Sequence, residues 1–135
     1  MSLIQWDSKF NVGVRTLDGQ HQQLINIINE LHEAMCKGHA KEVQTALLQR
    51  LSRYAAEHLN TEEKMLSSNG YPNFAQHKAQ HDNYISKMRE FEQKVGTGHV
   101  SLAITLLPFL KDWWTGHILK TDQQYTVFFK QKGVS

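Results

Sequence analysis

Four stretches of the chain repeat apolar side chains at steps of three and four residues, and this spacing restricts the fold more than any other feature. Such steps place the side chains on one face of an α-helix. The spacing predicts amphipathic helices at about 18–37, 41–66, 72–95 and 100–119. Turn signals separate the second helix from the third, because Gly70 and Pro72 both interrupt helices. Alternating patterns typical of strands are not found.

Four amphipathic helices of similar length with short connections predict an all-α fold, an antiparallel up-and-down four-helix bundle. Residues 1–135 suit one domain in length, with an N-terminal arm at 1–17 and a C-terminal segment at 120–135 that packs back on the bundle through its aromatic side chains. We expect Asp18 to cap the first helix. We also expect the single cysteine, Cys36, to be a small packed side chain without a disulfide.

Charge and hydropathy exclude several classes of partner. The formal net charge is only +2, with both signs spread along the chain, so nucleic acid is not indicated. No stretch approaches the roughly 20 apolar residues of a membrane span, and the start of the chain lacks the pattern of a secretion signal. We therefore expect a cytoplasmic protein without a membrane span, and a monomer.

Five of the eight histidines fall on the faces that the apolar pattern turns inward. They are His21, His58, His77, His81 and His117, whereas His39 and His99 lie in connections that contain glycine. Each buried ring nitrogen without a partner would cost about 1–3 kcal/mol. A shared metal would satisfy all five imidazoles, so the pattern favours a metal centre.

Helical spacing pairs these ligands with one another. His77 and His81 are four residues apart, as are His58 and Glu62, so each pair can face one ion. Either pair alone is weak evidence for a metal site, because a lone inward histidine is usually a hydrogen-bonded core residue. The combination is stronger, since every helix contributes an inward histidine and Asp122 falls near the same level of the bundle.

Other polar and aromatic residues of these helices are expected to be structural. His32 shares a face with His21 but lies eleven residues further on, about 16 Å along the axis, so it cannot join the same centre. Tyr54 and Tyr84 are each one turn from a ligand and are expected in the core.

The donor count favours two metal ions. Five imidazoles are too many for one tetrahedral zinc, and two carboxylates suit a bridged pair of ions such as iron, with one position open to a small ligand. Protein carboxylate is scarce compared with the ferritin-like sites that activate oxygen. The remaining neighbours are leucine and tryptophan rather than acids or bases, which favours binding over catalysis. A di-iron oxidase or peroxidase and a metal-storage or zinc-binding bundle remain as alternatives.

Four motifs match, in order and spacing, those of the hemerythrins. They are "DGQHQQL" around His21, "HLNTE" from His58, "HKAQH" from His77 and "HILKTD" from His117. The arm, with Trp6 and "VGV" at 12–14, is similar to the bacterial branch of that family. The resemblance implies a non-haem di-iron protein that binds dioxygen reversibly, as a carrier, store or delivery protein rather than an enzyme. It also implies an oxygen-consuming enzyme as recipient, while an O₂ or redox sensor using the same centre remains an alternative.

The resemblance also implies a division of the ligands between the two irons. His77, His81 and His117 would hold one iron, and His21 and His58 would hold the other, which keeps the open position. Glu62, Asp122 and an oxo or hydroxo group would bridge them. The residues implied for the O₂ pocket are Leu24, Leu59, Trp113, Trp114 and Ile118.

Two local features of the last helix carry further expectations. Asp122 lies five residues beyond His117, about 140° around a regular helix, so we expect the helix to end, bend or carry a wide turn between them. Trp114 stands where the family usually has leucine. If its indole points inward, we expect it to narrow the route to the open position.

Overall fold

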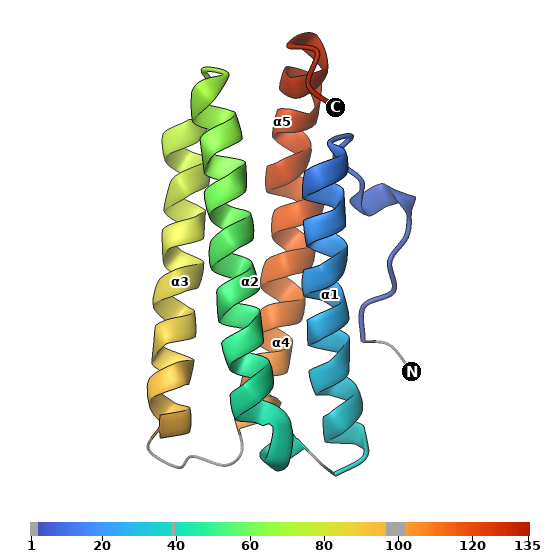
Figure 1. Ribbon diagram of the computed structural model, residues 1–135, viewed down its shortest axis with the longest axis vertical. Coiled ribbons are helices and arrows are strands. Elements are labelled where there is room, and N and C mark those ends of the chain that lie inside the picture. Colours follow the sequence, from blue (N-terminus) through green and yellow to red (C-terminus); the bar gives the residue numbers. More distant parts are fainter. Residues whose placement is uncertain (1–2, 39, 97–101) are drawn as a thin grey trace.

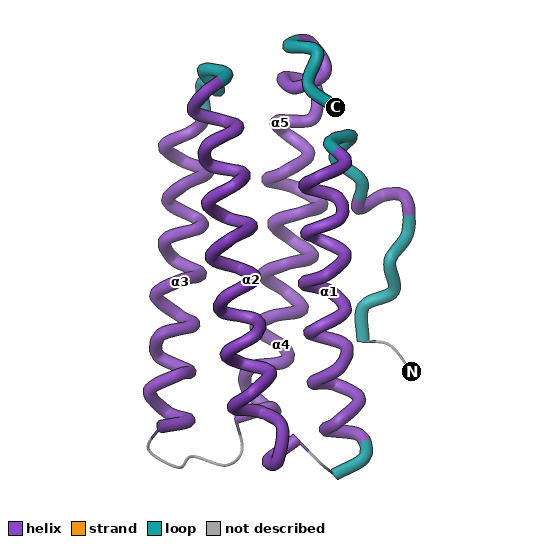
Figure 2. The backbone as a smooth tube through the Cα atoms, in the orientation of Figure 1, coloured by secondary structure: helices purple, strands orange, loops and turns teal. Residues whose placement is uncertain are grey.

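The structure, a computed structural model, describes residues 3–38, 40–96 and 102–135, and within these ranges its regular structure is entirely helical. The elements are η1 (Ser8–Phe10), α1 (Arg15–Cys36), α2 (Ala40–Ser68), α3 (Phe74–Gly96), α4 (Leu102–Gly116), η2 (His117–Thr121) and α5 (Asp122–Gln131). His39 and His99 lie outside the described residues. Among the residues that the structure describes, loops occupy only the arm and the ends of the helices (Figure 2).

The helices form an antiparallel four-helix bundle, as the sequence predicted (Figure 1). α4, η2 and α5 follow one another along a single rod, which supplies the fourth member of the bundle. α1 packs against α2 and α4, and α3 packs against α2 and α4. The N-terminal arm runs beside α1. The grouping of residues 1–135 into one domain stays a prediction.

Two apolar clusters fill the interior. The larger one includes Leu24, Leu59 and Trp114, and the smaller one includes Leu17, Leu66, Tyr71, Tyr125 and Phe129. Along each rod the inward histidines and acids fall between a member of one cluster and a member of the other. The polar residues therefore form one layer with apolar packing above and below, which shields them from water.

Two expectations about the core were wrong. Tyr54 is 38% exposed, and Ala55 at 2% takes the inward position instead, because Leu51, Ala55 and His58 already continue the buried stripe of α2 by steps of four and three. Cys36 is exposed rather than packed, since it lies in the last turn of α1. Tyr84, by contrast, lies in the core at 1% exposure, as expected.

The expected cap of α1 was also wrong. α1 begins at Arg15, with the extended residue Val14 at its N-cap position, so Asp18 lies inside the first turn. The Asp18 carboxylate accepts a hydrogen bond from the backbone N–H of Val12 at 2.7 Å. Asp18 therefore ties the arm to the helix instead of capping it.

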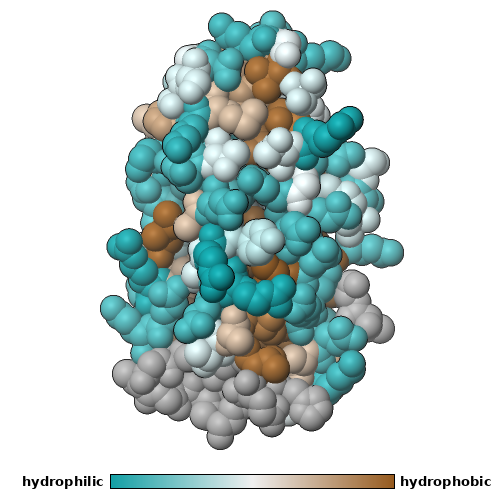
Figure 3. All heavy atoms as spheres, viewed as in Figure 1, coloured by the Kyte–Doolittle hydropathy of each residue, from teal (hydrophilic) through white to brown (hydrophobic). Residues whose placement is uncertain are grey.

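On the face shown in Figure 3, hydrophilic side chains predominate and apolar ones occur in small groups between them. In the described ranges, every helix is too short or too polar to cross a membrane.

Candidate metal centre

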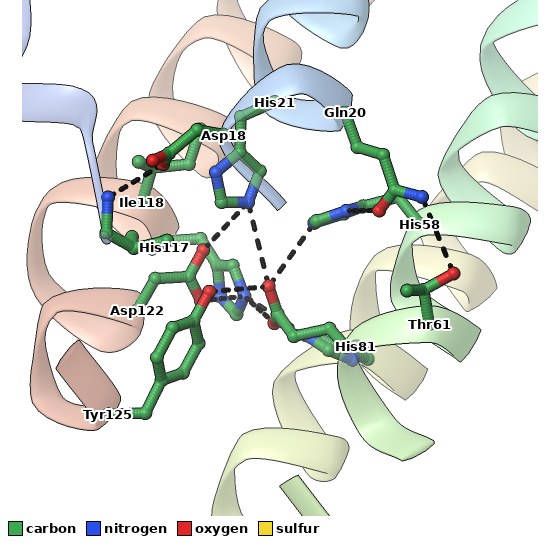
Figure 4. A network of polar contacts seen from close by, with 12 residues as sticks. Asp18, Gln20, His21, His58, Thr61, His81, His117, Ile118, Asp122 and Tyr125 are labelled. Carbon is green, nitrogen blue, oxygen red and sulfur yellow. Dashed lines mark hydrogen bonds and ion pairs between the residues drawn. The ribbon is translucent and has the colours of Figure 1, made fainter. Parts of the chain in front are cut away.

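Seven predicted ligands converge in the polar layer of the bundle. Figure 4 shows five of them, His21, His58, His81, His117 and Asp122, directed toward one another. Their exposed fractions are all 3% or less. α1 supplies His21, α2 supplies His58 and Glu62, α3 supplies His77 and His81, and the last rod supplies His117 and Asp122. The ligand atoms form two groups that share Glu62, one with three histidines and one with two.

The three-histidine group lies around one oxygen of each carboxylate. Glu62 Oε1 lies 2.5 Å from His77 Nε2, 3.0 Å from His81 Nε2 and 3.7 Å from His117 Nε2. Asp122 Oδ1 lies 3.0 Å from His117 Nε2 and 3.3 Å from His77 Nε2. Three imidazoles and two carboxylate oxygens therefore face one point.

The two-histidine group lies around the other oxygen of each carboxylate. Glu62 Oε2 lies 3.3 Å from His58 Nε2 and 3.6 Å from His21 Nε2. Asp122 Oδ2 lies 3.1 Å from His21 Nε2. Each carboxylate thus presents one oxygen to each group of histidines, which is the arrangement of a bridging ligand between two ions.

The expected wide turn between His117 and Asp122 is confirmed. η2 is a π-helical turn, and the N–H of Asp122 donates to the carbonyl of His117, five residues earlier. A π-turn accommodates one more residue than an α-turn and often occurs at functional sites. This turn brings Asp122, which a regular helix would point about 140° away, back to the face of His117.

Deleting Lys120, an exposed residue of η2, is expected to preserve metal binding. The deletion leaves His117 and Asp122 four residues apart, so a regular α-helix then points both side chains to the same face within about 40°. Zinc or cobalt titration and circular dichroism would show a helical protein with a nearly unchanged metal content.

Deleting Ala79, which is exposed between His77 and His81 in α3, provides the matched comparison. That helix has no wide turn to remove, so the deletion rotates every residue on one side of it, including one of the two histidines, by about 100° relative to the rest of the bundle. We expect this variant to lose metal. Equal loss in both deletion variants would contradict the role assigned to the π-turn.

Hydrogen bonds from outside the layer orient the imidazoles. Gln20 Oε1 accepts from His58 Nδ1 at 2.7 Å, and Gln80 Oε1 accepts from His117 Nδ1 at 3.1 Å. Because an amide oxygen only accepts, each of these rings carries a proton on Nδ1, and Nε2 is the nitrogen that faces the layer.

Sequence reasoning missed these partners and two others. Glu63 Oε2 accepts from His81 Nδ1 at 2.9 Å, and the Tyr125 hydroxyl donates to Glu62 Oε2 at 2.9 Å. Their position in the sequence could have indicated them, since Gln20, Gln80 and Glu63 each lie next to a ligand in the chain. Tyr125 follows Asp122 by three residues on one helix face.

Burial and charge act in opposite directions on these groups. Burial lowers the pKa of His21 and of His117, but the nearby carboxylates of Asp122 and Glu62 outweigh it and raise both pKa values to about 9. Burial, together with the charge of His21, lowers the pKa of His58. Burial alone would raise the pKa of Glu62 and Asp122, but the surrounding histidines outweigh it and hold both pKa values below their usual range.

The residues fit a pair of metal ions. Among the described residues, both ring nitrogens of His21, Nε2 of His58 and both oxygens of Asp122 are buried without a hydrogen bond. The Nε2 atoms of His81 and His117 face each other at 3.1 Å. Buried lone pairs in this arrangement are costly unless a cation lies between them. Imidazole and carboxylate donors together suit iron and other first-row metals.

The metal-free site is expected to release protons when it binds zinc. At pH 7.5, below the pKa of about 9, His21 and His117 both carry a proton that a metal must displace. Calorimetry in buffers of different ionisation enthalpy should therefore show release of about two protons per site. The apparent affinity should rise with pH up to about 9 and then level off. Binding without proton release would contradict these pKa values.

The same shifts affect the stability of the metal-free protein. A histidine whose pKa is raised on folding stabilises the fold fully below its ordinary pKa of 6.5, and this contribution is lost as the pH rises through about 9. The histidine contribution to the free energy of unfolding therefore declines over this interval.

The five residues expected for the O₂ pocket belong to the larger apolar cluster or pack against it. Leu24, Leu59, Trp114 and Ile118 are at most 1% exposed, and Trp113 is partly buried against the same cluster. The ring centroid of Trp114 lies 5.8 Å from that of His58, and Trp113 stacks on His117 at 4.4 Å.

His32 lies apart from the two groups of candidate ligands, as expected. It is only partly buried, and its Nε2 lies 3.6 Å from the exposed Cys36 Sγ. Neither group of ligand atoms includes it.

Comparison with known proteins gives a consistent result. Residues 12–127 match the family model described as hemerythrin HHE cation binding domain. A bacteriohemerythrin of Methylococcus capsulatus is 30% identical over 126 residues, covering 93% of this chain and 95% of that protein. Myohemerythrin of Sipunculus nudus is 28% identical over 121 residues, covering 89% of this chain and 88% of that protein. The crystal structure of a wild-type hemerythrin matches with a TM-score of 0.86 at 29% identity, covering 93% of this chain and 97% of that one.

Proposed function

This chain belongs to the hemerythrin family, and from that membership and the geometry of its site we propose that it is a non-haem di-iron protein that binds dioxygen reversibly. Its role is that of an oxygen carrier, store or delivery protein, and it is not an enzyme. One observation supports the proposal above all. Glu62 and Asp122 each direct one oxygen to the three-histidine group and the other oxygen to the two-histidine group.

We assign His77, His81 and His117 to one iron and His21 and His58 to the other, with Glu62 and Asp122 bridging them. When bound, the two irons would supply the electrons and the open position with which dioxygen combines reversibly. The position with fewer protein ligands is that of His21 and His58, and the ring of Trp114 lies 5.8 Å from that of His58.

The chain's own residues supply a dry, apolar wall for that position. Leu24, Leu59, Trp114 and Ile118 are buried side chains without an acid or base, and they disfavour the entry of water and anions. Tyr125 is the nearby hydroxyl, but it is held by Glu62, and its pKa is raised well above its usual value by burial and by the two carboxylates. It therefore stays a neutral donor that orients the bridge rather than an acid that delivers a proton.

The test is anaerobic reduction of the iron-loaded protein followed by exposure to air. Reversible binding predicts a visible charge-transfer band that disappears when oxygen is removed and returns when it is restored, with two irons per chain by elemental analysis. Steady consumption of reductant and oxygen would indicate a di-iron oxidase or peroxidase instead. Absence of iron under conditions that load known hemerythrins would overturn the assignment.

Three finer features stay predictions. They are a cytoplasmic location, a monomeric state and an oxygen-consuming enzyme as recipient. Sedimentation of the loaded protein tests the second, and accelerated oxygen release in the presence of a candidate enzyme tests the third.

A further inference from the structure

The hydrogen bond to His81 differs in charge from the other bonds that orient the ligand imidazoles. His81 Nδ1 donates at 2.9 Å to the carboxylate of Glu63, a neighbouring residue of the bridging Glu62 on α2. The His81 side chain is fully buried, and that of Glu63 is 19% exposed. The carboxylate is therefore only partly screened by water, and its charge acts on the imidazole through a poorly polarisable interior.

The other oriented imidazoles have neutral partners. His58 donates to the amide of Gln20, and His117 donates to the amide of Gln80, which also accepts from the Thr121 hydroxyl at 2.9 Å. His21 Nδ1 is buried without a hydrogen bond among the described residues. Three acceptors of an Nδ1 proton are thus identified among the described residues, and only one of them is charged. That one is the Glu63 carboxylate, which bonds to His81 of the three-histidine group.

A carboxylate hydrogen-bonded to a metal-bound imidazole makes the ring more basic and a stronger electron donor. Stronger donation stabilises the more highly charged ion at that position. A neutral amide orients the ring without this effect, because it contributes a dipole but no net charge.

We propose that Glu63 is a positioning residue that, through His81, makes the three-histidine iron harder to reduce than the two-histidine iron. The oxidised state is then stabilised more at the three-histidine position than at the two-histidine position, which adjoins the proposed apolar pocket. This inference rests on the proposed di-iron function and adds to it a residue that sets the balance between the two positions.

The decisive variant is Glu63→Gln, which keeps an acceptor for His81 Nδ1 and removes only the charge. We expect the lower of the two reduction potentials of the iron-loaded protein to rise, by an amount equal to about a tenfold change in equilibrium constant, or about 59 mV for one electron. The separation between the two one-electron steps should shrink. Potentials equal to those of the parent protein would overturn the proposal.

Two further variants separate charge from structure. Gln20→Glu places a carboxylate against His58, at the two-histidine group, and should lower the higher potential and so also bring the two steps together. Glu57→Gln makes the same change of charge as Glu63→Gln at an exposed position of α2 and should leave both potentials unchanged. If Glu57→Gln and Glu63→Gln gave equal shifts, net charge rather than the contact with His81 would be responsible, and the proposal would fail.

A readout without iron or oxygen keeps the inference distinct from the proposed function. In the zinc-loaded protein, the Nδ1 proton of His81 should resonate further downfield than that of His58, and Glu63→Gln should abolish this difference. Glu63→Ala, which leaves the ring without an acceptor, should lower zinc affinity by about 10–100-fold. If Glu63→Gln changes the chemical shift of the His81 proton but the iron-loaded protein does not bind oxygen reversibly, the proposed function fails. The contact between Glu63 and His81 is then still supported. An unaltered proton shift in Glu63→Gln would reject the contact itself.

Discussion

Replacing Glu62 by alanine is expected to lower metal affinity by more than about 100-fold, beyond the usual effect of losing a partner outside the ligand shell. The reason is that Glu62 serves both groups, with Oε1 facing the three histidines on one side and Oε2 facing His21 and His58 on the other. Iron content by elemental analysis and zinc affinity by calorimetry measure the loss. Since a bound metal stabilises only the folded state, the loaded variant should also melt at a lower temperature.

The same substitution affects the metal-free protein through Tyr125. Its hydroxyl is buried and donates to Glu62 Oε2 at 2.9 Å, so the alanine variant leaves a buried donor unpaired at a cost of about 1–3 kcal/mol. Glu62→Gln retains an acceptor and should recover most of that stability while still weakening metal binding. Urea unfolding of the two metal-free variants separates these contributions.

Asp122→Ala and His32→Ala complete the comparison. Asp122 faces His21 through one oxygen and His77 and His117 through the other, so its loss should also deplete iron. His32 lies outside both ligand groups, and its variant should keep the parent's iron content. An equal response of iron loading to all three substitutions would show that the ligands are placed wrongly.

The sequence predicted the ligand layer because helical spacing determines which side chains share a face. His77 with His81 and His58 with Glu62 follow directly from a four-residue step. Asp122 could be placed among the ligands only if the helix departed from regular geometry, and the π-turn is that departure. Tyr54 shows the limit of prediction from spacing. Steps of three and four from Leu51 allow either Tyr54 or Ala55 to face inward, and in the structure Ala55 is the buried one.

The outer hydrogen bonds could not be predicted in the same way. Glu63 reaches His81 from a different helix, and Gln20 reaches His58 across the bundle. Such contacts depend on the rotation and height of one helix relative to another, which the periodicity of a single helix does not contain. The convergence of the seven candidate ligands could therefore be predicted from the sequence, whereas the charge distribution around them required the packed structure.

Trp114→Leu is expected to accelerate oxygen association and dissociation by about tenfold if the indole adds about 1.4 kcal/mol to the entry barrier. Trp114 is completely buried, and its ring lies 5.8 Å from His58 and 6.4 Å from His117, so it is next to both histidine groups. An indole is much larger than an isobutyl group, and a well-packed core has little spare room for it. Stopped-flow kinetics of the iron-loaded protein measures the change.

The autoxidation rate should increase together with the oxygen kinetics. Leucine would leave a cavity within the larger apolar cluster, which includes Leu24, Leu59 and Ile118, and an apolar cavity admits small apolar molecules more readily than water. Access of oxygen therefore improves first, and protection from water and anions decreases as the pocket loosens. The seven ligands are untouched, so iron content should stay the same.

A control on the same helix separates pocket access from general loosening of the core. Phe109 is a partly buried aromatic residue five positions earlier on α4, and it packs on Tyr84 and Phe91 rather than on a ligand histidine. Phe109→Leu removes aromatic packing from the same rod and should leave oxygen kinetics unchanged. Kinetics altered equally by both variants would reflect flexibility of the bundle, and kinetics unchanged in Trp114→Leu would mean that the indole only fills space. A tenfold change confined to Trp114→Leu would identify the indole as the side chain that limits access to the two-histidine position.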